Sequence, residues 1–179
     1  MEHVKKARFR FAAILITSVF LAASAGCGYH LLGKGKGELA GARSIAIPYF
    51  TNKTYQPGLD RVFTEALLNQ FIESRRFAIT TPDQADVVMK GTLKSLEEQT
   101  ISYDRNDRVL EYRLTVKMDF SAEERLTGKV IWRDTNITHN EEYGRREDIA
   151  FTEFDKDEAI KRLAAELAER IHDNLLEGF

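Results

Sequence analysis

The feature that most constrains the fold is a strict alternation of apolar and polar residues between Leu110 and Ala122. The apolar side chains stand at every second position: Leu110, Tyr112, Leu114, Val116, Met118, Phe120 and Ala122. The positions between them carry Glu111, Arg113, Thr115, Lys117 and Asp119. Successive side chains of a β-strand point to opposite faces, so this strand has one apolar face and one charged face. The pattern predicts an antiparallel sheet that is covered on one side only.

Two further strands are expected beside this one. Before it, Val87, Met89, Gly91 and Leu93 alternate, and the apolar phase then shifts to Leu96, which predicts a β-bulge. After it, the turn Thr127-Gly128-Lys129 leads into a strand from Val130 to Thr138 that carries the only tryptophan, Trp132.

The preceding segment predicts a β-α-β unit. Residues 44–50 form a strand in which Ile45, Ile47 and Tyr49 alternate, and Pro48, which lacks an amide hydrogen, belongs near its edge or end. A turn from Asn52 to Gly58 precedes a helix. Its apolar residues recur at three- and four-residue spacing: Leu59, Val62, Phe63, Ala66, Leu67 and Phe71. Phe77, Ile79 and Thr81 alternate in a short second strand.

A long amphipathic helix is expected at the C-terminal end, with Asp155 or Asp157 as its N-cap residue. Its apolar stripe consists of Ile160, Leu163, Ala164, Leu167, Ile171 and Leu175. Glu158–Arg162 and Glu166–Arg170 have the spacing of i,i+4 ion pairs.

These elements define the expected fold class. Two amphipathic helices and a sheet with one apolar face bury their apolar surfaces most simply when both helices pack on that face. We therefore expect an α+β fold, an α/β two-layer sandwich with one mixed, mostly antiparallel sheet of four to five strands.

The first 26 residues have the pattern of a signal peptide. A basic start, with Lys5, Lys6, Arg8 and Arg10, precedes a low-charge run from Phe11 to Ala25. As a helix this run reaches about 20 Å, which is short of the ~30 Å hydrocarbon core of a bilayer, so a cleaved leader is expected rather than a permanent span.

The only cysteine, Cys27, directly follows Ala25 and Gly26. This arrangement resembles the bacterial lipobox, although Ser24 stands where the lipobox usually has leucine. The resemblance implies that Cys27 is lipidated and the leader removed. The chain then divides into a signal peptide at 1–26, a lipidated N-terminus and flexible tether at 27–43, and one periplasmic domain at 44–179.

The charge balance limits the partners of the mature chain. Removing the leader takes away four basic residues and one acidic residue, which leaves 22 basic and 27 acidic residues and a net charge of −5. A surface with this balance does not attract nucleic acid or other polyanions through its overall field. An anionic ligand would need a local cluster of arginine and lysine.

The sequence contains no arrangement typical of an enzyme. Its histidines, His3, His30, His139 and His172, are far apart and do not have metal-binding spacing. The only thiol is assigned to the lipid. We therefore expect neither catalysis nor a metal or cofactor.

One basic cluster is the candidate binding site. Arg105 and Arg108 lie in a polar loop between two long strands, Arg145 and Arg146 follow the last strand, and Lys129 lies in the opposite turn. Guanidinium groups bind phosphates through paired, charge-assisted hydrogen bonds. The alternative is that these residues are ordinary solvated loop charges.

Several segments together resemble the LPS-assembly lipoprotein family, LptE. They are Cys27-Gly-Tyr-His-Leu31, the strand and loop Ile45-Ala-Ile-Pro-Tyr-Phe-Thr-Asn-Lys-Thr54, and Pro57-Gly-Leu59 before a helix. The resemblance covers essentially the whole mature chain. It implies a sheet with two helices on one side, and a lipoprotein that plugs the LptD β-barrel and binds lipopolysaccharide.

The resemblance also implies roles for individual residues. The family has an arginine that affects lipopolysaccharide binding in an Arg-Asn loop before a Glu-Tyr strand start. That pattern is Arg105-Asn106 and then Glu111-Tyr112 here. A second basic position follows the last strand in the family, and Arg145 and Arg146 are both candidates for it. Gly28, in place of the aspartate that retains lipoproteins in the inner membrane, implies the outer membrane.

Other functions remain open at this point. A lipoprotein that activates a cell-wall synthase, or one that pilots a secretion channel, would also place a small α/β domain on a long tether. A periplasmic hydrolase would need a nucleophile and a base that the sequence does not reveal.

Overall fold

The computed structural model describes Leu39 and residues 41–177, which lie in a unit that begins at Gly35. The predicted signal peptide, Cys27 and most of the predicted tether lie outside the described residues, and the expectations for them stay predictions. Leu39 is only 4% exposed and belongs to the core. The packed part of the chain therefore includes a residue that precedes the domain boundary expected at residue 44.

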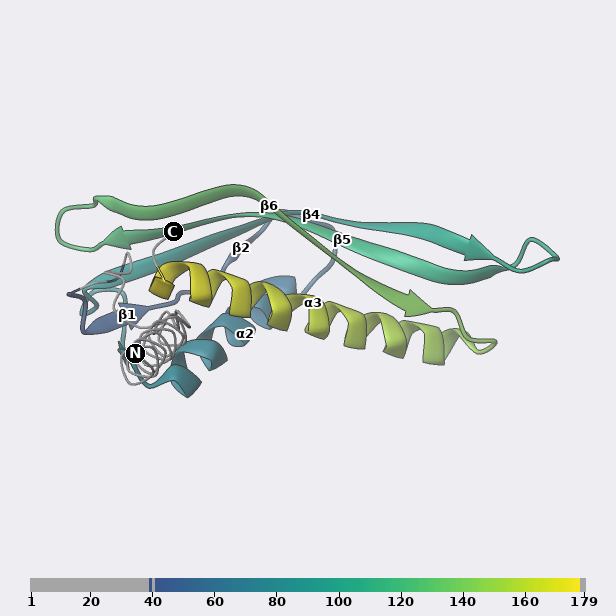
Figure 1. The fold of residues 1–179 in the computed structure, drawn as a ribbon, viewed down its shortest axis with the longest axis horizontal. Helices are drawn as coiled ribbons and strands as arrows, with labels where there is room; N and C mark the ends of the chain where they lie inside the picture. The colour runs from purple at the N-terminus through teal and green to yellow at the C-terminus, as the bar shows by residue number, and fades with distance from the viewer. Residues whose placement is uncertain (1–38, 40, 178–179) are drawn as a thin grey trace, which may run out of the picture. The chain divides into compact units, whose positions relative to one another are not determined.

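Six strands and two helices follow one another along this part of the chain (Figure 1). They are β1 (Ser44–Ala46), β2 (Thr51–Asn52), α2 (Leu59–Ser74), β3 (Ala78–Ile79), β4 (Val87–Tyr103), β5 (Val109–Glu124), β6 (Val130–Gly144) and α3 (Ile149–Glu177).

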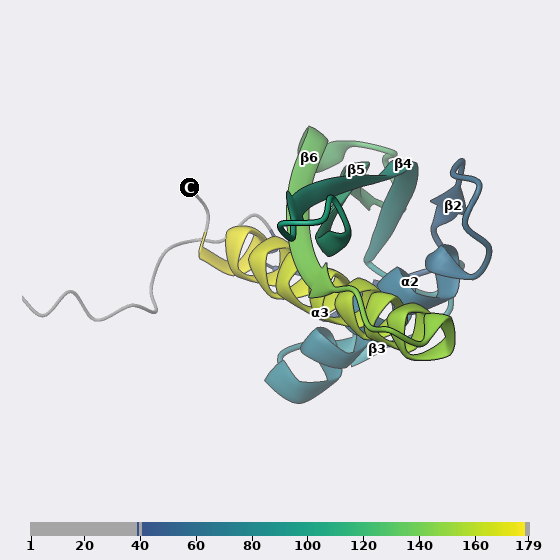
Figure 2. The same cartoon turned by 90° about the vertical axis from the view of Figure 1, so that its right-hand side faces the viewer.

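The strands form one mixed sheet in the order β3-β1-β4-β5-β6, and the short β2 pairs with β4 beyond β1. β1 is parallel to β3 and β4, whereas β4, β5 and β6 form a long antiparallel meander. Both helices lie on the same side of this sheet (Figures 1 and 2). The expected α+β class and the two-layer arrangement are thus confirmed.

The prediction of one continuous strand over residues 44–50 is wrong for the second half of this segment. β1 ends at Ala46, and pairing with β4 resumes only at Thr51 in β2. Pro48 interrupts the segment because it cannot donate a ladder hydrogen bond. After Pro48 the residues that point toward the core are no longer those at odd positions, so that Tyr49 is 69% exposed while Phe50 is buried.

β4 and β5 follow the sequence pattern except at Leu110, on the predicted apolar face of β5, which is 47% exposed. β4 and β5 change register between Leu93 and Ser95, which confirms the expected bulge. β6 continues six residues past the expected end at Thr138, to Gly144. A register shift at Asn136, whose φ is 60°, separates its two halves. The sequence pattern does not reveal the second half because His139 and Glu141, which face the helices there, are polar.

The core fills the space between the apolar sheet face and the two helices. Its largest fully buried side chains come from every layer: Ile45, Leu59, Leu67, Phe71, Met89, Leu93, Leu114, Met118, Phe120, Leu163, Leu167 and Leu175. Thr64 of α2 is the buried polar residue among them. Its Oγ1 accepts a hydrogen bond from the Phe50 amide (3.0 Å) and donates one to the Asp60 carbonyl oxygen (2.6 Å), which ties the β1–β2 connection to α2.

α3 begins earlier than expected, at Ile149. Asp148, not Asp155 or Asp157, supplies the capping acceptor, because its Oδ1 accepts a hydrogen bond from the Ala150 amide at 2.8 Å. The two expected i,i+4 pairs are also replaced. Glu158 pairs with Lys161, Arg162 with Glu141, and Glu166 with His139. Two of these three pairs join α3 to β6, so they stabilise the contact between layers.

Asp86 connects the beginnings of β1 and β4. Its Oδ2 accepts hydrogen bonds from the amides of Arg43 (2.8 Å) and Ser44 (3.0 Å) and from the Ser44 hydroxyl (3.0 Å). The Arg43 amide, followed by the Ser44 hydroxyl and amide, holds the pKa of this carboxyl below its usual 3.8.

We expect Asp86→Asn to lower the melting temperature at neutral pH. A carboxyl whose pKa is lower in the folded state stabilises the fold above its unfolded-state pKa, and the contribution disappears as the pH falls through the folded-state pKa. The difference between wild type and variant should therefore shrink below about pH 4. Thermal unfolding followed at several pH values tests this, with Asp83→Asn, at another exposed aspartate, as the control. A difference that does not change with pH would contradict the assignment.

Candidate functional site

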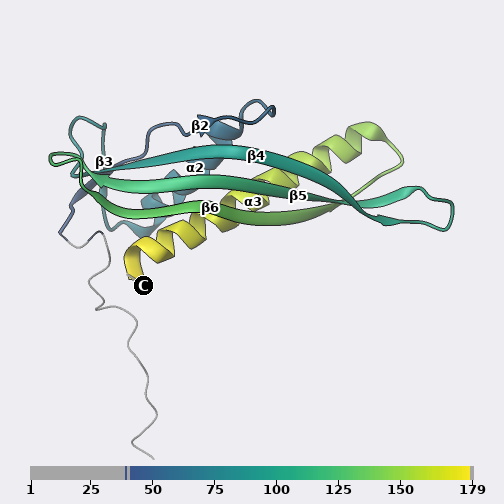
Figure 3. The ribbon, with the colours of Figure 1, turned by 90° about the horizontal axis from the view of Figure 1, so that it is seen from above.

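The structure brings four of the five candidate basic residues to one end of the sheet. Arg105 and Arg108 lie in the β4–β5 turn, and Arg145 and Arg146 follow β6 directly. Glu111 pairs with Gly144, and the Arg145 amide donates a hydrogen bond to the Leu110 carbonyl oxygen at 2.8 Å. The start of β5 and the end of β6 are therefore adjacent, and Figure 3 shows both connections at the same end of the domain. We call this end the arginine end.

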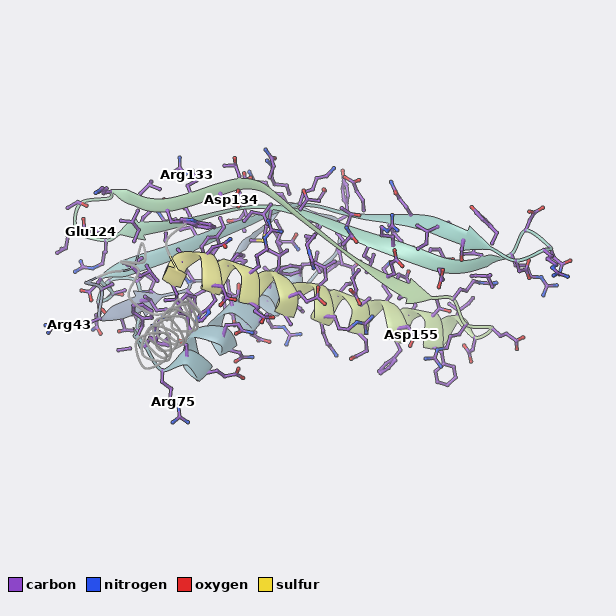
Figure 4. The ribbon with its side chains drawn as sticks, viewed as in Figure 1. Arg43, Arg75, Glu124, Arg133, Asp134 and Asp155 are labelled. Carbon is purple, nitrogen blue, oxygen red and sulfur yellow. The ribbon has the colours of Figure 1, made fainter. Side chains whose placement is uncertain are left out.

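Lys129 is not part of this group, because it lies in the β5–β6 turn. β5 has 16 residues, which at ~3.3 Å per residue places the two ends of the sheet about 50 Å apart. Figure 4 shows the separation, with Glu124, whose amide donates a hydrogen bond to the Lys129 carbonyl oxygen, at the opposite end from Asp155.

Asp104 organises the turn that presents Arg105 and Arg108. Its Oδ1 accepts hydrogen bonds from the amides of Asn106 (2.7 Å) and Arg108 (2.9 Å), and Asp107 adopts a left-handed φ of 57°. An aspartate side chain that binds the following amides is a common way to close a turn. Both Arg105 and Arg108 are exposed in this turn.

Arg145 and Arg146 have different environments. The Arg146 guanidinium donates two hydrogen bonds to Asp155 of α3, from Nε at 2.5 Å and from Nη2 at 3.0 Å. The Asp155 carboxylate also raises the pKa of Arg146. Within the described part of the chain, by contrast, Arg105, Arg108 and Arg145 form no ion pair with a carboxylate. Arg146 therefore fixes the start of α3, and Arg145 is the residue available for a ligand.

The sheet face away from the helices is charged, and most of its lysine and arginine side chains form ion pairs with carboxylates on neighbouring strands. Four cross-strand ion pairs occupy it: Lys90–Glu123, Lys94–Asp119, Lys117–Glu97 and Arg113–Glu142. Hydrogen bonds from Lys117 and Lys90 hold the pKa values of Glu97 and Glu123 below their usual range, and the Asn136 amide does the same for Asp119. Arg133 projects from β6 on this side (Figure 4). The face is thus polar without a large excess of either charge.

The described residues contain no cluster of metal-binding side chains. No group of three or more histidine, cysteine, aspartate or glutamate residues in this part of the chain could hold a metal ion. His139 Nε2 lies 2.7 Å from Glu166, and the His172 ring packs on Phe71 at 5.0 Å. The two described histidines therefore lie against side chains of the fold, His139 beside Glu166 and His172 beside Phe71. No helix among the described residues is long and apolar enough to cross a membrane.

Sequence reasoning missed Asp104 and Asp155, the two acids that position the arginines. The Asp104-Arg-Asn-Asp107 sequence is a turn signal, from which the role of Asp104 could have been predicted. No signal identifies Asp155 as the partner of Arg146, because the pair joins a loop to the second turn of a helix.

Comparison with known proteins identifies a matching family model and solved structures with a similar fold. The family model described as "LptE: Lipopolysaccharide-assembly" matches residues 42–175. A search of curated proteins gave no match. A solved structure of a candidate lipoprotein from Caulobacter crescentus CB15 has a TM-score of 0.52, with 11% identity over 71% of this chain and 87% of that one. Rare lipoprotein B from Shewanella oneidensis has a TM-score of 0.48, with 16% identity over 69% of this chain and 90% of that one. At such identities the similarity concerns the fold alone.

Proposed function

The chain belongs to the LptE family of lipopolysaccharide-assembly proteins, and on this premise we propose that it binds lipopolysaccharide during assembly of the outer leaflet. In this proposal Cys27 is lipidated and anchors the protein in the outer membrane. The domain faces the periplasm, inserts into the lumen of an LptD-type β-barrel and plugs it.

The observation that supports ligand binding is the group of three arginines at the arginine end: Arg105, Arg108 and Arg145. Their guanidinium groups are free of ion pairs with the described carboxylates, so they can donate to phosphate oxygens without first breaking an internal contact. The chain as a whole is acidic, which makes a local cluster necessary for any phosphorylated ligand. We assign these three residues to the phosphates of the lipid A and core region.

The ion pairs on the sheet face away from the helices support the proposal that the domain plugs the barrel. The interior of a large outer-membrane barrel is polar. A face on which Lys90, Lys94, Lys117 and Arg113 already bind neighbouring carboxylates can lie against polar barrel residues and leave few charges unpaired. This role involves binding and positioning, and we propose no catalytic step.

We expect Arg105→Glu to weaken lipopolysaccharide binding by the purified domain about tenfold or more. A hydrogen bond to a charged group contributes about 1.5–3 kcal/mol, and 1.4 kcal/mol corresponds to a factor of ten in the dissociation constant. Charge reversal adds repulsion from the phosphates. Titration with lipopolysaccharide at fixed ionic strength measures the effect.

Lys129→Glu is the matched control, because it makes the same charge change in the turn at the other end of the sheet. Arg146→Ala tests the distinction between neighbouring arginines. It should lower the melting temperature, since Arg146 binds Asp155, and should weaken binding less than Arg145→Ala. Equal binding by folded Arg105→Glu and wild-type protein would refute the assignment of Arg105.

A further inference from the structure

The first ten residues of α3, Ile149–Glu158, extend beyond the core. None of them is buried, whereas the buried stripe of the helix starts at Ala159 and Ile160. Figures 1 and 3 show most of this part of the helix running past α2. Only its end meets α2, where Asp157 lines a hollow with Leu59, Arg61 and Val62. We call residues 149–158 the α3 extension. Lys156 in this segment forms an ion pair with Glu98 of β4, with 2.5 Å between Nζ and Oε2.

The α3 extension exposes large apolar side chains. Ile149 is 75% exposed, Phe151 58% and Phe154 59%. Phe151 and Phe154 are three residues apart and therefore lie on the same side of the helix. Most helices in proteins owe their stability to packing of an apolar face. Three helical turns that present two phenylalanines to water therefore indicate a surface that a partner covers.

The charge of the same segment indicates the chemistry of that partner. The α3 extension contains four acidic residues and one basic residue, Lys156, and the two residues before it, Glu147 and Asp148, are also acidic. Three of the acids are used elsewhere: Asp155 pairs with Arg146, Glu158 with Lys161, and Asp148 caps the helix. Glu147, Glu153 and Asp157 form no ion pair with another described residue, and they give this part of the chain a negative charge. Such a surface repels the phosphates of an anionic lipid and attracts lysine or arginine.

We infer that the α3 extension is a protein-docking surface, which inserts Phe151 and Phe154 into an apolar groove flanked by basic residues. The inference rests on the proposed function, which supplies the partner: the LptD-type barrel protein. The α3 extension is a different surface from the three free arginines, because it is acidic and apolar. The two surfaces lie at the same end of the domain, so the partner would hold the arginine end in a fixed orientation.

The test measures binding to the barrel protein and binding to lipopolysaccharide with one set of variants. The full-length lipoprotein is co-expressed with the LptD-type barrel of the same organism, and the amount of barrel that co-purifies is determined. Lipopolysaccharide binding by the isolated domain is measured in parallel. The variants are Phe151→Ala with Phe154→Ala, and Glu153→Lys with Asp157→Lys. The control is Tyr49→Ala with Leu126→Ala, which removes two other exposed apolar side chains.

Both test variants should reduce the co-purified barrel at least tenfold, while the control and the affinity for lipopolysaccharide stay unchanged. Unchanged co-purification would overturn the docking inference and leave the arginine assignment standing. Stronger lipopolysaccharide binding after the change to lysine, with co-purification intact, would overturn it in favour of a lipid-facing surface. Absence of the barrel from the wild-type preparation would contradict the proposed function itself and remove the basis of the inference.

Discussion

Replacing Gly91 with alanine is expected to destabilise the domain by about 2–3 kcal/mol, although the substitution adds one methyl group. Gly91 is the fifth residue of β4, and the ring of Phe50 packs directly on it. A Cβ atom at this position would lie 2.6 Å from two atoms of the Phe50 ring and 2.8 Å from a third. Phe50 cannot move freely, because it is 5% exposed and its ring contacts Phe120 edge-to-face with the ring centres 6.0 Å apart.

Chemical denaturation and thermal unfolding would measure the effect. For a domain of this size each kcal/mol corresponds to roughly 2–4 °C in melting temperature. Gly144→Ala in β6 is the matched control, because the nearest atom to its added Cβ is the Leu110 carbonyl oxygen at 4.0 Å. The double variant Gly91→Ala with Phe50→Leu should be less destabilised than the sum of the single changes, since residues in direct contact are energetically coupled. Additive effects would show that Phe50 is not the cause.

The relation between Gly91 and Phe50 marks the limit of what the sequence reveals. Alternation places Gly91 on the inward face of β4, and the structure agrees. No sequence pattern pairs it with Phe50, because the interruption at Pro48 changes which side chain points inward. Strand periodicity identifies the face of a residue but not its neighbour from another element.

Neighbours from other elements also explain why β6 and α3 differ from the elements predicted from the sequence. β5 was predictable because one of its faces packs on the core and the other carries charges. The second half of β6 faces the helices with His139 and Glu141, whose partners Glu166 and Arg162 come from α3. Because His139 and Glu141 bind polar side chains of α3, these inward-facing positions carry polar residues, and the sequence pattern does not distinguish them from exposed positions. The α3 extension was missed for the converse reason, since Phe151 and Phe154 do not continue the buried stripe.

In the candidate site, too, local features were predictable from the sequence and contacts between elements were not. The turn sequence around Arg105 was sufficient to locate a presented arginine. The choice between Arg145 and Arg146 depended on Asp155, which is a contact between a loop and a helix. Ligand binding by these arginines stays a prediction.

Removing the lipid from Cys27 is expected to release the protein from the membrane almost completely. We propose that wild-type protein carries acyl chains on Cys27. Each buried methylene contributes about 0.8 kcal/mol, and although one myristoyl chain binds only reversibly, two or more chains anchor a protein stably. A chain that starts at Gly28, exported behind an ordinary cleavable leader, should therefore appear in the soluble periplasmic fraction. The isolated domain should still bind lipopolysaccharide, because the three free arginines lie in the folded domain and need no anchor.

The fractionation needs a host without the barrel partner, since a protein held in the barrel lumen would remain in the membrane fraction without any lipid. In that host the wild-type protein should stay with the membranes and the truncated chain should not. The mass of the wild-type product separates the two causes of membrane association, because acylation adds the mass of the lipid and leader removal subtracts residues 1–26. A wild-type product with a free thiol on Cys27 would contradict the anchor. It would leave the arginine assignment intact, because that assignment depends on the folded domain alone.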